Sequence, residues 1–487
     1  MQYTSEQLPV INYQGNHLVI KAFAGCGKTS TLVGYAKAHA DLKMLYLAYN
    51  RAIRDEGAAK FPRNVVCKTA HQLAWPEFGS RYQHKLGNLR LTDIAQFLGT
   101  RNWKLIKAAQ GTLNAYLSSD ARELDETHVE AGMDPDDYLT ASEKLIREVV
   151  DMGRKLWEGM IDPDSRLNCV HDAYLKLFQL SNPVLPFDVI LFDEAQDSNP
   201  VTAALVSSQT ARKIFVGDRW QQIYRWRGAE DALEKEIAKG ADLMHLTNSF
   251  RFGPMIAGAA NVVLRFQGEK RSLVGLGPSD KVYTVLPPGI RKYTVLNRTV
   301  AGVLQTAIEE VQRGRVVYWV GGIESYQIQD IEDLHHLKSG DHKKIVNQRL
   351  VKQFPSYGHY EDAAQEAKDL EMTRLVKILK DYPDVPRIVA ALRKNMALEE
   401  EDADVVVSTV HRSKGLEWES VIMENDFPDL FDTGERAMSA EQRADELNLL
   451  YVAVTRAKSN LVINASVEGL VLKAHAEARK ARSVQNV

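Results

Sequence analysis

The sequence is poor in cysteine and has no apolar run long enough to span a membrane. Its three cysteines, Cys26, Cys67 and Cys169, form no C-x-x-C pair, which argues against a zinc knuckle and a disulfide framework. The opening residues, MQYTSEQLPV, lack the basic and then apolar pattern of a secretory signal. These features predict a cytoplasmic protein in a reducing compartment.

Neither sign of charge is in excess. The 61 lysines and arginines nearly balance the 64 aspartates and glutamates, which leaves a net charge of −3. A nucleic-acid partner would therefore need a locally basic channel. The chain has no repeat of solenoid length. Its 487 residues, 45% hydrophobic and 26% charged, suffice for two or more globular domains with cores of their own.

A glycine-rich stretch, KAFAGCGKTSTL at 21–32, stands between an apolar run at 17–20 and an expected helix at 30–40. This strand, loop and helix order is the setting of a phosphate-binding loop. The strict pattern G-x-x-x-x-G-K-[ST] is not fully met, because Ala22 occupies the first glycine position. An ordinary glycine-rich turn between a strand and a helix is the alternative.

The residues of this stretch fit the chemistry of nucleotide binding. Side chains are small or absent at Ala24, Gly25 and Gly27, so backbone N–H groups can approach the oxygens of a polyphosphate. Lys28 can reach the outer phosphates, and the Thr29 hydroxyl can ligate Mg²⁺. The stretch therefore predicts a bound nucleotide together with Mg²⁺.

Polar and basic residues follow two further apolar runs that are expected to be buried strands. Asn50 and Arg51 follow the run at 44–49, and Thr69 and His71 follow the run at 64–67. In open α/β sheets ligands bind at the carboxyl ends of the strands. A solvated loop would have a similar composition, so both interpretations stand on these residues alone.

The strongly apolar run at 187–192 is closed by the acidic sequence DEAQD at 193–197. The Asp193 carboxylate can hold Mg²⁺, and Glu194 can orient or deprotonate an attacking water. The alternative is an acidic helix N-terminus, which the helix dipole favours. A carboxylate at a strand end in a chain with a phosphate-binding loop favours the metal-binding interpretation.

The segment at 217–229, GDRWQQIYRWRGA, follows an expected strand at 213–216 and holds two tryptophans, a tyrosine and three arginines. Aromatic faces stack on bases and arginine pairs with phosphate, so this composition predicts contact with nucleic acid. A packing loop between domains is the alternative.

The rest of the chain reads as one helical insertion and a second α/β core. Apolar residues recur at helical spacing over 72–185. A second set of apolar runs predicts strands, and these lie at 293–296, 316–320, 405–408, 421–423 and 461–463. A charged segment at 323–384 interrupts this second core as a further insertion.

Two late motifs, VSTVHRSKGLEW at 407–418 and LLYVAVTRAK at 449–458, complete an ordered set with those above. With them the sequence resembles the superfamily 1 DNA helicases of the UvrD/Rep/PcrA group. Within that group it is most similar to the F-box DNA helicases, on FPRNVVCKTAH at 61–71 and ELNLLY at 446–451. No F-box is expected, because the chain carries no additional N-terminal region.

The resemblance implies an α/β fold of two RecA-like P-loop cores, parallel sheets flanked by helices, with mainly helical insertions and ATP in the cleft between the cores. The implied domains are core 1A at 1–71 and 186–253, insertion 1B at 72–185, core 2A at 254–322 and 385–487, and a short insertion 2B at 323–384.

The same resemblance implies roles for individual residues. The residues implied to contact the nucleotide are Gln7, Ala24, Gly25, Cys26, Gly27, Lys28, Thr29, Ser30, Phe250 and Glu417. Of these, Gln7 and Phe250 are implied to contact adenine. The residues implied to bind Mg²⁺ are Thr29 and Asp193. The residues implied in catalysis are Lys28, Asp193, Glu194, Gln221, Arg251 and Arg456, and the two arginines would act as arginine fingers. The implied DNA-binding residues are Asn50, Arg51, Thr69, His71, Tyr224, Trp226, Arg227, Thr409 and His411.

The implied activity is that of an ATP-dependent DNA helicase or translocase that moves 3′→5′ on single-stranded DNA, in DNA repair, recombination or replication. Its partners would be single-stranded DNA, 3′-tailed duplexes and a nuclease or recombinase, with no membrane, and a bacterial or phage protein would associate with the nucleoid. The alternative is an ATP-gated DNA-binding subunit or a protein-stripping translocase, working with a nuclease or in phage defence.

Three departures from the family pattern bear on these expectations. Cys26 stands where the family usually has threonine or serine, and Ser249 replaces a usual asparagine. The insertion at 323–384 is short for this group. Its length argues against regulation through a large swivelling domain.

Overall fold

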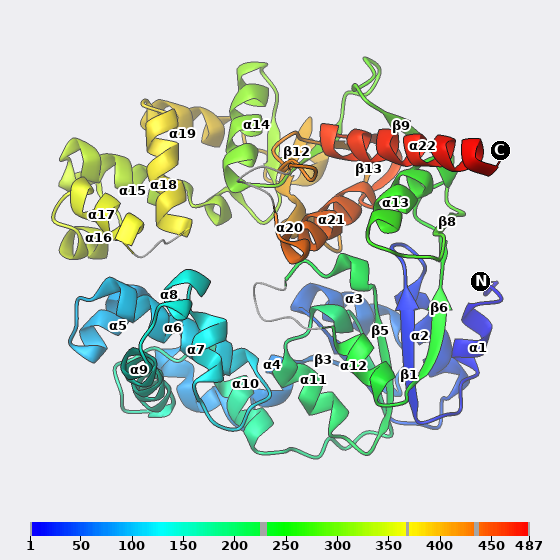
Figure 1. Cartoon of the computed structure of the whole chain (residues 1–487), viewed down its shortest axis with the longest axis horizontal. Coiled ribbons are helices and arrows are strands. Elements are labelled where there is room, and N and C mark those ends of the chain that lie inside the picture. The colour runs from blue at the N-terminus through cyan, green and yellow to red at the C-terminus, as the bar shows by residue number, and fades with distance from the viewer. Residues whose placement is uncertain (1, 225–230, 367–369, 433–437, 486–487) are drawn as a thin grey trace. The chain divides into compact units, whose positions relative to one another are not determined.

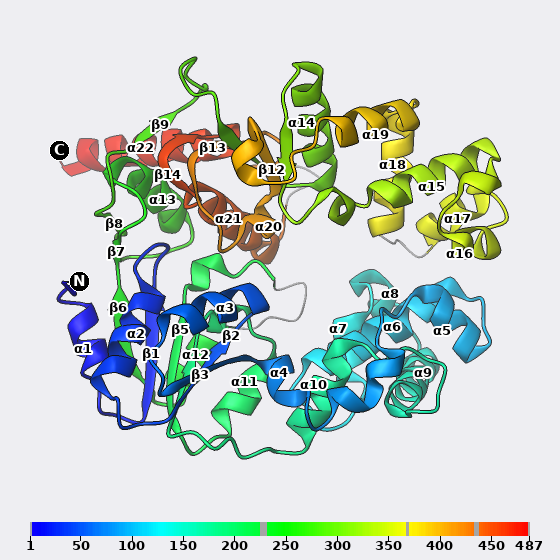
Figure 2. The same cartoon turned by 180° about the vertical axis from the view of Figure 1, so that it is seen from behind.

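The computed structural model describes residues 2–224, 231–366, 370–432 and 438–485. It divides into two compact units, shown with their labelled elements in Figures 1 and 2. The first unit comprises Met1–Ala22, Lys28–His245 and Gln365–Lys368, and the second comprises Phe23–Gly27, Leu246–Ala364 and Asp369–Val487. The glycine-rich loop of residues 23–27 thus belongs with the second unit, although the chain on either side of it belongs to the first.

The first unit contains a six-stranded sheet in the order β3-β2-β4-β5-β1-β6. Its strands are β1 (His17–Ala22), β2 (Met44–Ala48), β3 (Val65–Thr69), β4 (Val189–Phe192), β5 (Arg212–Gly217) and β6 (Asp242–Leu246). The pairs that join β3, β2, β4, β5 and β1 are all parallel. Every residue of β2 and β4 is buried, as expected for parallel strands covered on both faces, and this explains their unbroken apolar sequences.

Helices cover this sheet and form the insertion after β3. The α-helices are α1 (Gln7–Ile11), α2 (Lys28–Ala38), α3 (Arg51–Lys60), α4 (Ala70–Ala74), α5 (Leu91–Leu98), α6 (Trp103–Ser118), α7 (Thr127–Gly132), α8 (Pro135–Leu139), α9 (Glu143–Ile161), α10 (His171–Leu180), α11 (Pro200–Ser207) and α12 (Ala232–Ala238). Short 3-10 helices are η1 (Gly79–Lys85), η2 (Ala195–Asp197) and η3 (Arg219–Gln221). Helices α5 to α9 gather at one end of the unit (Figure 1). One cluster of buried apolar side chains continues from the sheet into these helices.

The second unit contains a six-stranded sheet in the order β11-β12-β10-β13-β14-β9, with every neighbouring pair parallel. Its strands are β9 (Lys281–Tyr283), β10 (Tyr293–Asn297), β11 (Val317–Trp319), β12 (Val405–Thr409), β13 (Trp418–Met423) and β14 (Ala457–Val462). A separate parallel pair joins β7 (Asn248–Ser249) and β8 (Val274–Gly275). Strands β10 and β12 are buried throughout and form the centre of this sheet.

The helices of the second unit flank that sheet and form the second insertion. The α-helices are α13 (Pro254–Phe266), α14 (Val300–Gln312), α15 (Ile328–Ser339), α16 (Gln348–Gln353), α17 (Tyr357–Glu366), α18 (Leu370–Asp381), α19 (Val385–Lys394), α20 (Val410–Ser413), α21 (Ala440–Val454) and α22 (Ala465–Gln485). Short 3-10 helices are η5 (Ile323–Tyr326), η6 (His342–Lys344) and η7 (Glu400–Asp402). None of the helices in the described part of the chain combines the length and the apolar character needed to cross a bilayer.

The expected α/β fold of parallel sheets flanked by helices is confirmed. Several of the expected bounds differ from the structure. Strand β13 begins at Trp418 and not at 421, β14 begins at Ala457 and not at 461, and β4 begins at Val189 and not at 187. The helix expected at 30–40 begins two residues earlier, so that Lys28 is its first residue, and the strand expected at 316–320 is limited to Val317–Trp319. Strand β9 was not predicted, because three residues at a sheet edge form no apolar run.

Candidate active site

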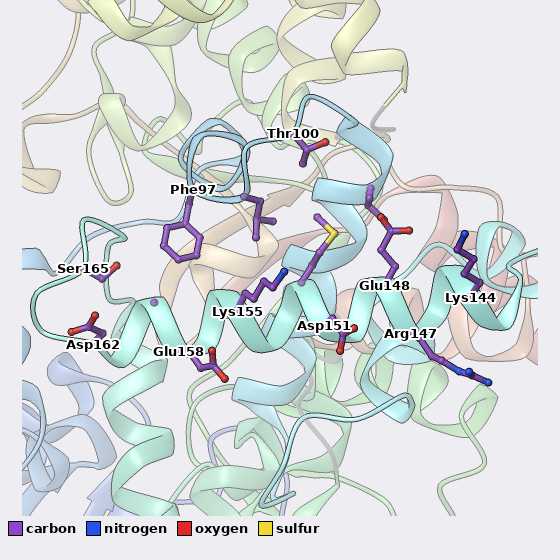
Figure 3. Close-up of a pocket in the computed structure, with 14 residues that line it drawn as sticks. Phe97, Thr100, Lys144, Arg147, Glu148, Asp151, Lys155, Glu158, Asp162 and Ser165 are labelled. Atoms are coloured by element: carbon purple, nitrogen blue, oxygen red, sulfur yellow. The ribbon is translucent and has the colours of Figure 1, made fainter.

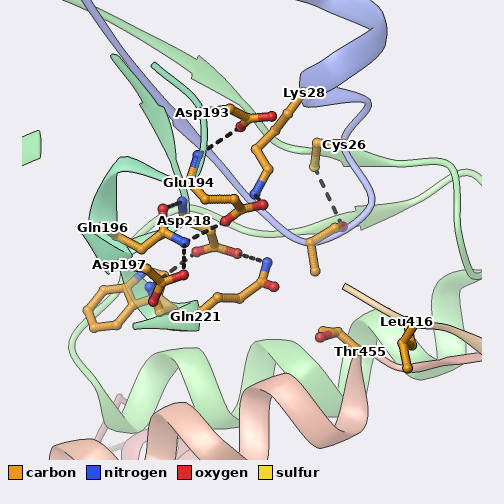
Figure 4. Close-up of polar contacts among 12 residues, drawn as sticks. Cys26, Lys28, Asp193, Glu194, Gln196, Asp197, Asp218, Gln221, Leu416 and Thr455 are labelled. Atoms are coloured by element: carbon orange, nitrogen blue, oxygen red, sulfur yellow. Dashed lines mark hydrogen bonds and ion pairs between the residues drawn. The ribbon is translucent and has the colours of Figure 1, made fainter. Parts of the chain in front are cut away.

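The glycine loop, residues 23–27, has the backbone conformation of an anion-binding loop. Gly25 and Gly27 have φ of +73° and +72°, a left-handed region that favours glycine. Successive residues of this kind turn their backbone N–H groups toward one side, where an anion can accept from them. Cys26 is 1% exposed and its thiol lies 3.8 Å from the carbonyl oxygen of Ala24 (Figure 4), so the thiol packs within the loop.

The glycine loop packs closely against the segment that carries Arg251. The Phe250 N–H donates to the Gly25 carbonyl oxygen at 2.9 Å. A Cβ added at Gly25 would lie 2.4 Å from the Ser249 hydroxyl oxygen and 2.8 Å from the Arg251 Cβ. Glycine at this position is therefore required both by the backbone conformation and by the space.

Lys28, the first residue of α2, forms an ion pair with Glu194: its Nζ lies 2.8 Å from Glu194 Oε1 (Figure 4). Burial alone would lower the pKa of Lys28. The nearby carboxylates of Glu194, Asp193 and Asp218 outweigh that effect, and the pKa of Lys28 is raised. The surrounding carboxylates therefore favour the charged form of the lysine.

Asp193 and Glu194 follow the buried strand β4 and differ in their surroundings. Asp193 accepts hydrogen bonds from the Tyr46 hydroxyl at 2.7 Å and from the Glu194 N–H at 2.9 Å. Burial and the adjacent Glu194 charge raise the pKa of Asp193 above its ordinary value. Glu194 has a φ of +52°, a conformation that costs free energy for a residue other than glycine and is found mainly at functional sites.

Gln196 connects this acidic pair to the end of strand β5. Its Nε2 donates to Glu194 Oε2 at 2.6 Å, and its Oε1 accepts from the Asp218 N–H at 3.0 Å. Asp218 in turn accepts from Gln221 Nε2 at 2.7 Å (Figure 4). A Cβ at Gly217 would lie 2.2 Å from Gln196 Oε1, which explains the glycine. The sequence interpretation gave no role to Gln196 or Asp218, although both stand in the polar segments that follow strands.

The composition of this site fits a divalent cation. Three carboxylates, those of Asp193, Glu194 and Asp218, act on a single ammonium group, so negative charge is in excess. Within the described ranges no three histidine, cysteine or acidic residues cluster closely enough to hold a metal ion by themselves. Mg²⁺ commonly takes one or two carboxylates and completes its shell with substrate phosphates and water.

Two arginines of the second unit have side chains held by hydrogen bonds. Arg251 Nε lies 2.6 Å from Glu417 Oε2, and its Nη1 donates to the Thr455 carbonyl oxygen at 2.8 Å. Arg456 is 1% exposed and donates to the carbonyl oxygens of Val452 and Leu416, both at 3.0 Å. Arg251 thus stands beside the glycine loop, whereas Arg456 is enclosed by its own unit.

The two residues expected at adenine differ in exposure. Gln7 is buried in the first unit, where its Nε2 donates to the Thr31 hydroxyl at 2.9 Å and its Oε1 accepts from the Thr4 N–H at 3.0 Å. Phe250 of the second unit is 45% exposed.

Both units contain the same arrangement of threonine and histidine at a strand end. Thr69 ends β3 and caps α4, and His71 is the second residue of that helix. Thr409 ends β12 and caps α20, and His411 is likewise its second residue. Each threonine hydroxyl accepts from the backbone N–H three residues on, so the histidine follows a fixed turn. His71 is additionally held by Asp172, whose Oδ1 lies 3.2 Å from its Nε2.

Three of the other residues expected at DNA, Asn50, Arg51 and Tyr224, belong to the first unit. Asn50 caps α3 by accepting from the Ile53 N–H, and the Arg51 side chain is 85% exposed. Tyr224 stacks on Tyr49 with ring centroids 5.8 Å apart. Trp226 and Arg227 lie outside the described residues, so their assignment stays a prediction.

A pocket of about 1140 Å³ opens along α9 in the first unit (Figure 3). Its lining mixes Lys144, Arg147 and Lys155 with Glu148, Asp151, Glu158 and Asp162. It contains none of the residues expected at nucleotide or DNA. Because the two signs of charge are interspersed, the lining does not indicate an anionic or a cationic ligand.

Two parallel α/β sheets, a left-handed glycine loop and a lysine paired with a strand-end carboxylate define a protein of the nucleotide-binding P-loop class. The UvrD-like helicase C-terminal domain matches residues 200–468, more than half of the chain. The chain therefore belongs to the UvrD-like helicase family.

Curated relatives extend this similarity over nearly the whole chain. F-box DNA helicase 1 of Gallus gallus is 33% identical over 97% of this chain and 50% of its own length. F-box DNA helicase protein 1 of Schizosaccharomyces pombe is 29% identical over 96% of this chain and 58% of its own length. DNA helicase II of Escherichia coli is 32% identical over 113 residues, 22% of this chain and 16% of its own length. The chain spans about half the length of the two F-box helicases.

The substitution Gly25→Ala is expected to weaken ATP binding by about 10- to 100-fold, because the added methyl group overlaps the Ser249 hydroxyl and Arg251. Gly99→Ala is the matched control. Gly99 also has a positive φ, +66°, but a Cβ there would meet no atom within 4 Å. That control should lose about 1–2 kcal/mol of stability and retain its ATP affinity. Both variants are tested by the binding of a fluorescent ATP analogue and by thermal melting. If Gly25→Ala binds ATP as tightly as Gly99→Ala, the loop is not the phosphate-binding loop.

Proposed function

We propose that this chain is an ATP-driven DNA helicase that moves 3′→5′ along single-stranded DNA and separates the duplex ahead of it. The observation that carries the proposal is the Lys28–Glu194 ion pair beside Asp193, in a chain of the UvrD-like helicase family. The direction of movement is taken from the family resemblance alone.

The glycine loop and Lys28 are the proposed phosphate-binding groups. When a phosphate oxygen replaces Glu194 as the partner of Lys28, the Glu194 carboxylate is released to accept the proton of an attacking water. Thr29 and Asp193 would hold Mg²⁺, which would supply positive charge to offset the phosphate oxygens. Gln196 keeps Glu194 in its strained conformation through the 2.6 Å hydrogen bond, so little reorganisation is needed for reaction.

The remaining nucleotide contacts come from side chains in both units. Gln7 and Phe250 are proposed to contact adenine, and Glu417 to contact the ribose. Gln221 is proposed to sense the terminal phosphate, because its amide is already fixed by Asp218. Arg251 and Arg456 are proposed to stabilise the charge that spreads over the transferring phosphoryl group.

The repeated threonine and histidine turns support the proposal of DNA contact. They hold His71 just past the end of β3 and His411 just past the end of β12. Tyr224 and Trp226 are proposed to stack on bases, which gives a grip that does not depend on sequence. A cycle of ATP binding and hydrolysis that changes this grip in two similar units would move the strand in one direction.

Strand displacement from a 3′-tailed duplex is expected to require ATP and to be faster than displacement from a matched 5′-tailed duplex. ATP hydrolysis, measured on the same preparation, is expected to rise when single-stranded DNA is added. Displacement of the 5′-tailed duplex alone would contradict the direction. Stimulated hydrolysis without displacement would favour a protein-stripping translocase, and ATP-dependent DNA binding without hydrolysis would favour an ATP-gated subunit.

A further inference from the structure

A buried tyrosine of the second unit contacts the glycine loop directly. Tyr451 lies on α21 and has 0% of its surface exposed. Its hydroxyl accepts a hydrogen bond from the Ala24 N–H at 3.1 Å, and both atoms are buried. The two residues are separated by 427 positions in the sequence, yet both belong to the second unit.

The Tyr451 backbone connects this contact to Arg251. Its carbonyl oxygen accepts from the Thr455 N–H at 3.1 Å and from the Thr455 hydroxyl at 2.8 Å. The Thr455 carbonyl oxygen accepts from Arg251 Nη1 at 2.8 Å. The Phe250 N–H, next to Arg251 in the chain, donates back to Gly25 at 2.9 Å. The glycine loop is therefore held at both Ala24 and Gly25 by one connected set of hydrogen bonds.

Such a double attachment matters because glycine-rich loops lose much conformational entropy when they are ordered. A loop already fixed in its left-handed conformation does not have to be ordered when the phosphates bind. The Ala24 N–H donates to Tyr451, so this N–H, which was expected to approach a phosphate, is used instead to hold the loop.

We propose that Tyr451 is a positioning residue for the glycine loop, and that its hydroxyl holds the loop in the conformation that binds nucleotide phosphates. The inference rests on the proposed function. An attachment that is present before and during reaction contributes equally to the ground state and the transition state. Its loss should therefore raise KM for ATP and leave kcat unchanged at saturating ATP.

The test is Tyr451→Phe, which removes one hydroxyl and leaves the ring. Its matched control is Tyr326→Phe. Tyr326 is also buried in the second unit, and its hydroxyl donates to the Val320 carbonyl oxygen at 3.1 Å. Both variants lose one buried hydrogen bond to the backbone, so a merely structural effect should lower their melting temperatures similarly.

Tyr451→Phe is expected to bind ATP and ADP each about three- to tenfold more weakly than wild type, the value of one ordinary hydrogen bond. Its KM for ATP should rise by the same factor, whereas Tyr326→Phe should match wild type. Amide hydrogen exchange in a peptide covering residues 20–30 should be faster in Tyr451→Phe alone. That exchange measurement needs no activity and also applies if one variant is less stable.

Unchanged nucleotide affinity and unchanged loop exchange in Tyr451→Phe would overturn the positioning role. A fall in kcat at constant KM would also overturn it, since the hydroxyl would then act in the transition state. These results are distinguishable from failure of the proposed function. In that case the wild-type chain itself would bind neither ATP nor ADP, and no comparison among the variants would be needed.

Discussion

Arg251→Ala is expected to reduce DNA-stimulated ATP hydrolysis on the order of 10³-fold or more, with a much smaller change in ATP affinity. The magnitude is that of losing an arginine that stabilises a transferring phosphoryl group. The Cβ of Arg251 lies beside Gly25 of the glycine loop, which supports the proposed role. Affinity should be retained, because Lys28 and the N–H groups of the loop remain.

The ion pair with Glu417 requires a control, because Arg251→Ala also removes a salt bridge of the second unit. Arg393→Ala supplies it: Arg393 Nη2 lies 3.1 Å from Glu324 and 2.9 Å from Glu332, and this control should hydrolyse ATP at the wild-type rate. Equilibrium binding and steady-state hydrolysis are measured on each preparation. If Arg251→Ala hydrolyses ATP within a few-fold of the wild-type rate, Arg251 is not an arginine finger.

Arg456 is a less direct test of the same idea. Its guanidinium is buried and bonded to Val452 and Leu416, so alanine there would leave buried carbonyl oxygens without their donor. Loss of activity in that variant would combine a catalytic effect with a folding effect. Arg251 is the better site for the experiment, because its side chain is 14% exposed whereas Arg456 is 1% exposed.

The sequence predicted the parts of the structure that have local signals. Strands such as β2 and β12 are buried throughout, so their apolar runs were visible. The helices between β3 and β4 were predicted from the helical periodicity over 72–185. The roles of individual site residues and the division into cores and insertions remain predictions, although the structure brings Lys28, Asp193 and Glu194 together.

Other features could not be predicted because they depend on contacts between distant parts of the chain. Nothing in the sequence of residues 23–27 indicates that they pack with Ser249 and Tyr451. Gln196 was visible in the acidic run, but its bond to the Asp218 backbone depends on two strands lying side by side. Hydrogen bonds of this kind follow from the folded topology and leave no periodic pattern.

Glu194→Gln is expected to reduce ATP hydrolysis by about 10²- to 10⁴-fold, the range for losing a general base. The glutamine keeps the size of the side chain but cannot take a proton from water. ATP affinity should stay the same or increase, because one negative charge beside Lys28 is removed while Asp193 and Asp218 still favour the charged lysine. A variant that binds ATP well and barely hydrolyses it is therefore the expected result.

The matched control is Glu234→Gln in the same unit, where Glu234 Oε1 pairs with Lys21 Nζ at 2.6 Å. It also removes a carboxylate from a lysine, but Lys21 belongs to strand β1 and not to the proposed site. The control should therefore retain wild-type turnover. If ATP affinity and turnover fall together in Glu194→Gln, the ion pair with Lys28 has a structural role in the site. Another group must then activate the water. If turnover persists with affinity intact, the strained conformation of Glu194 serves the fold rather than the reaction.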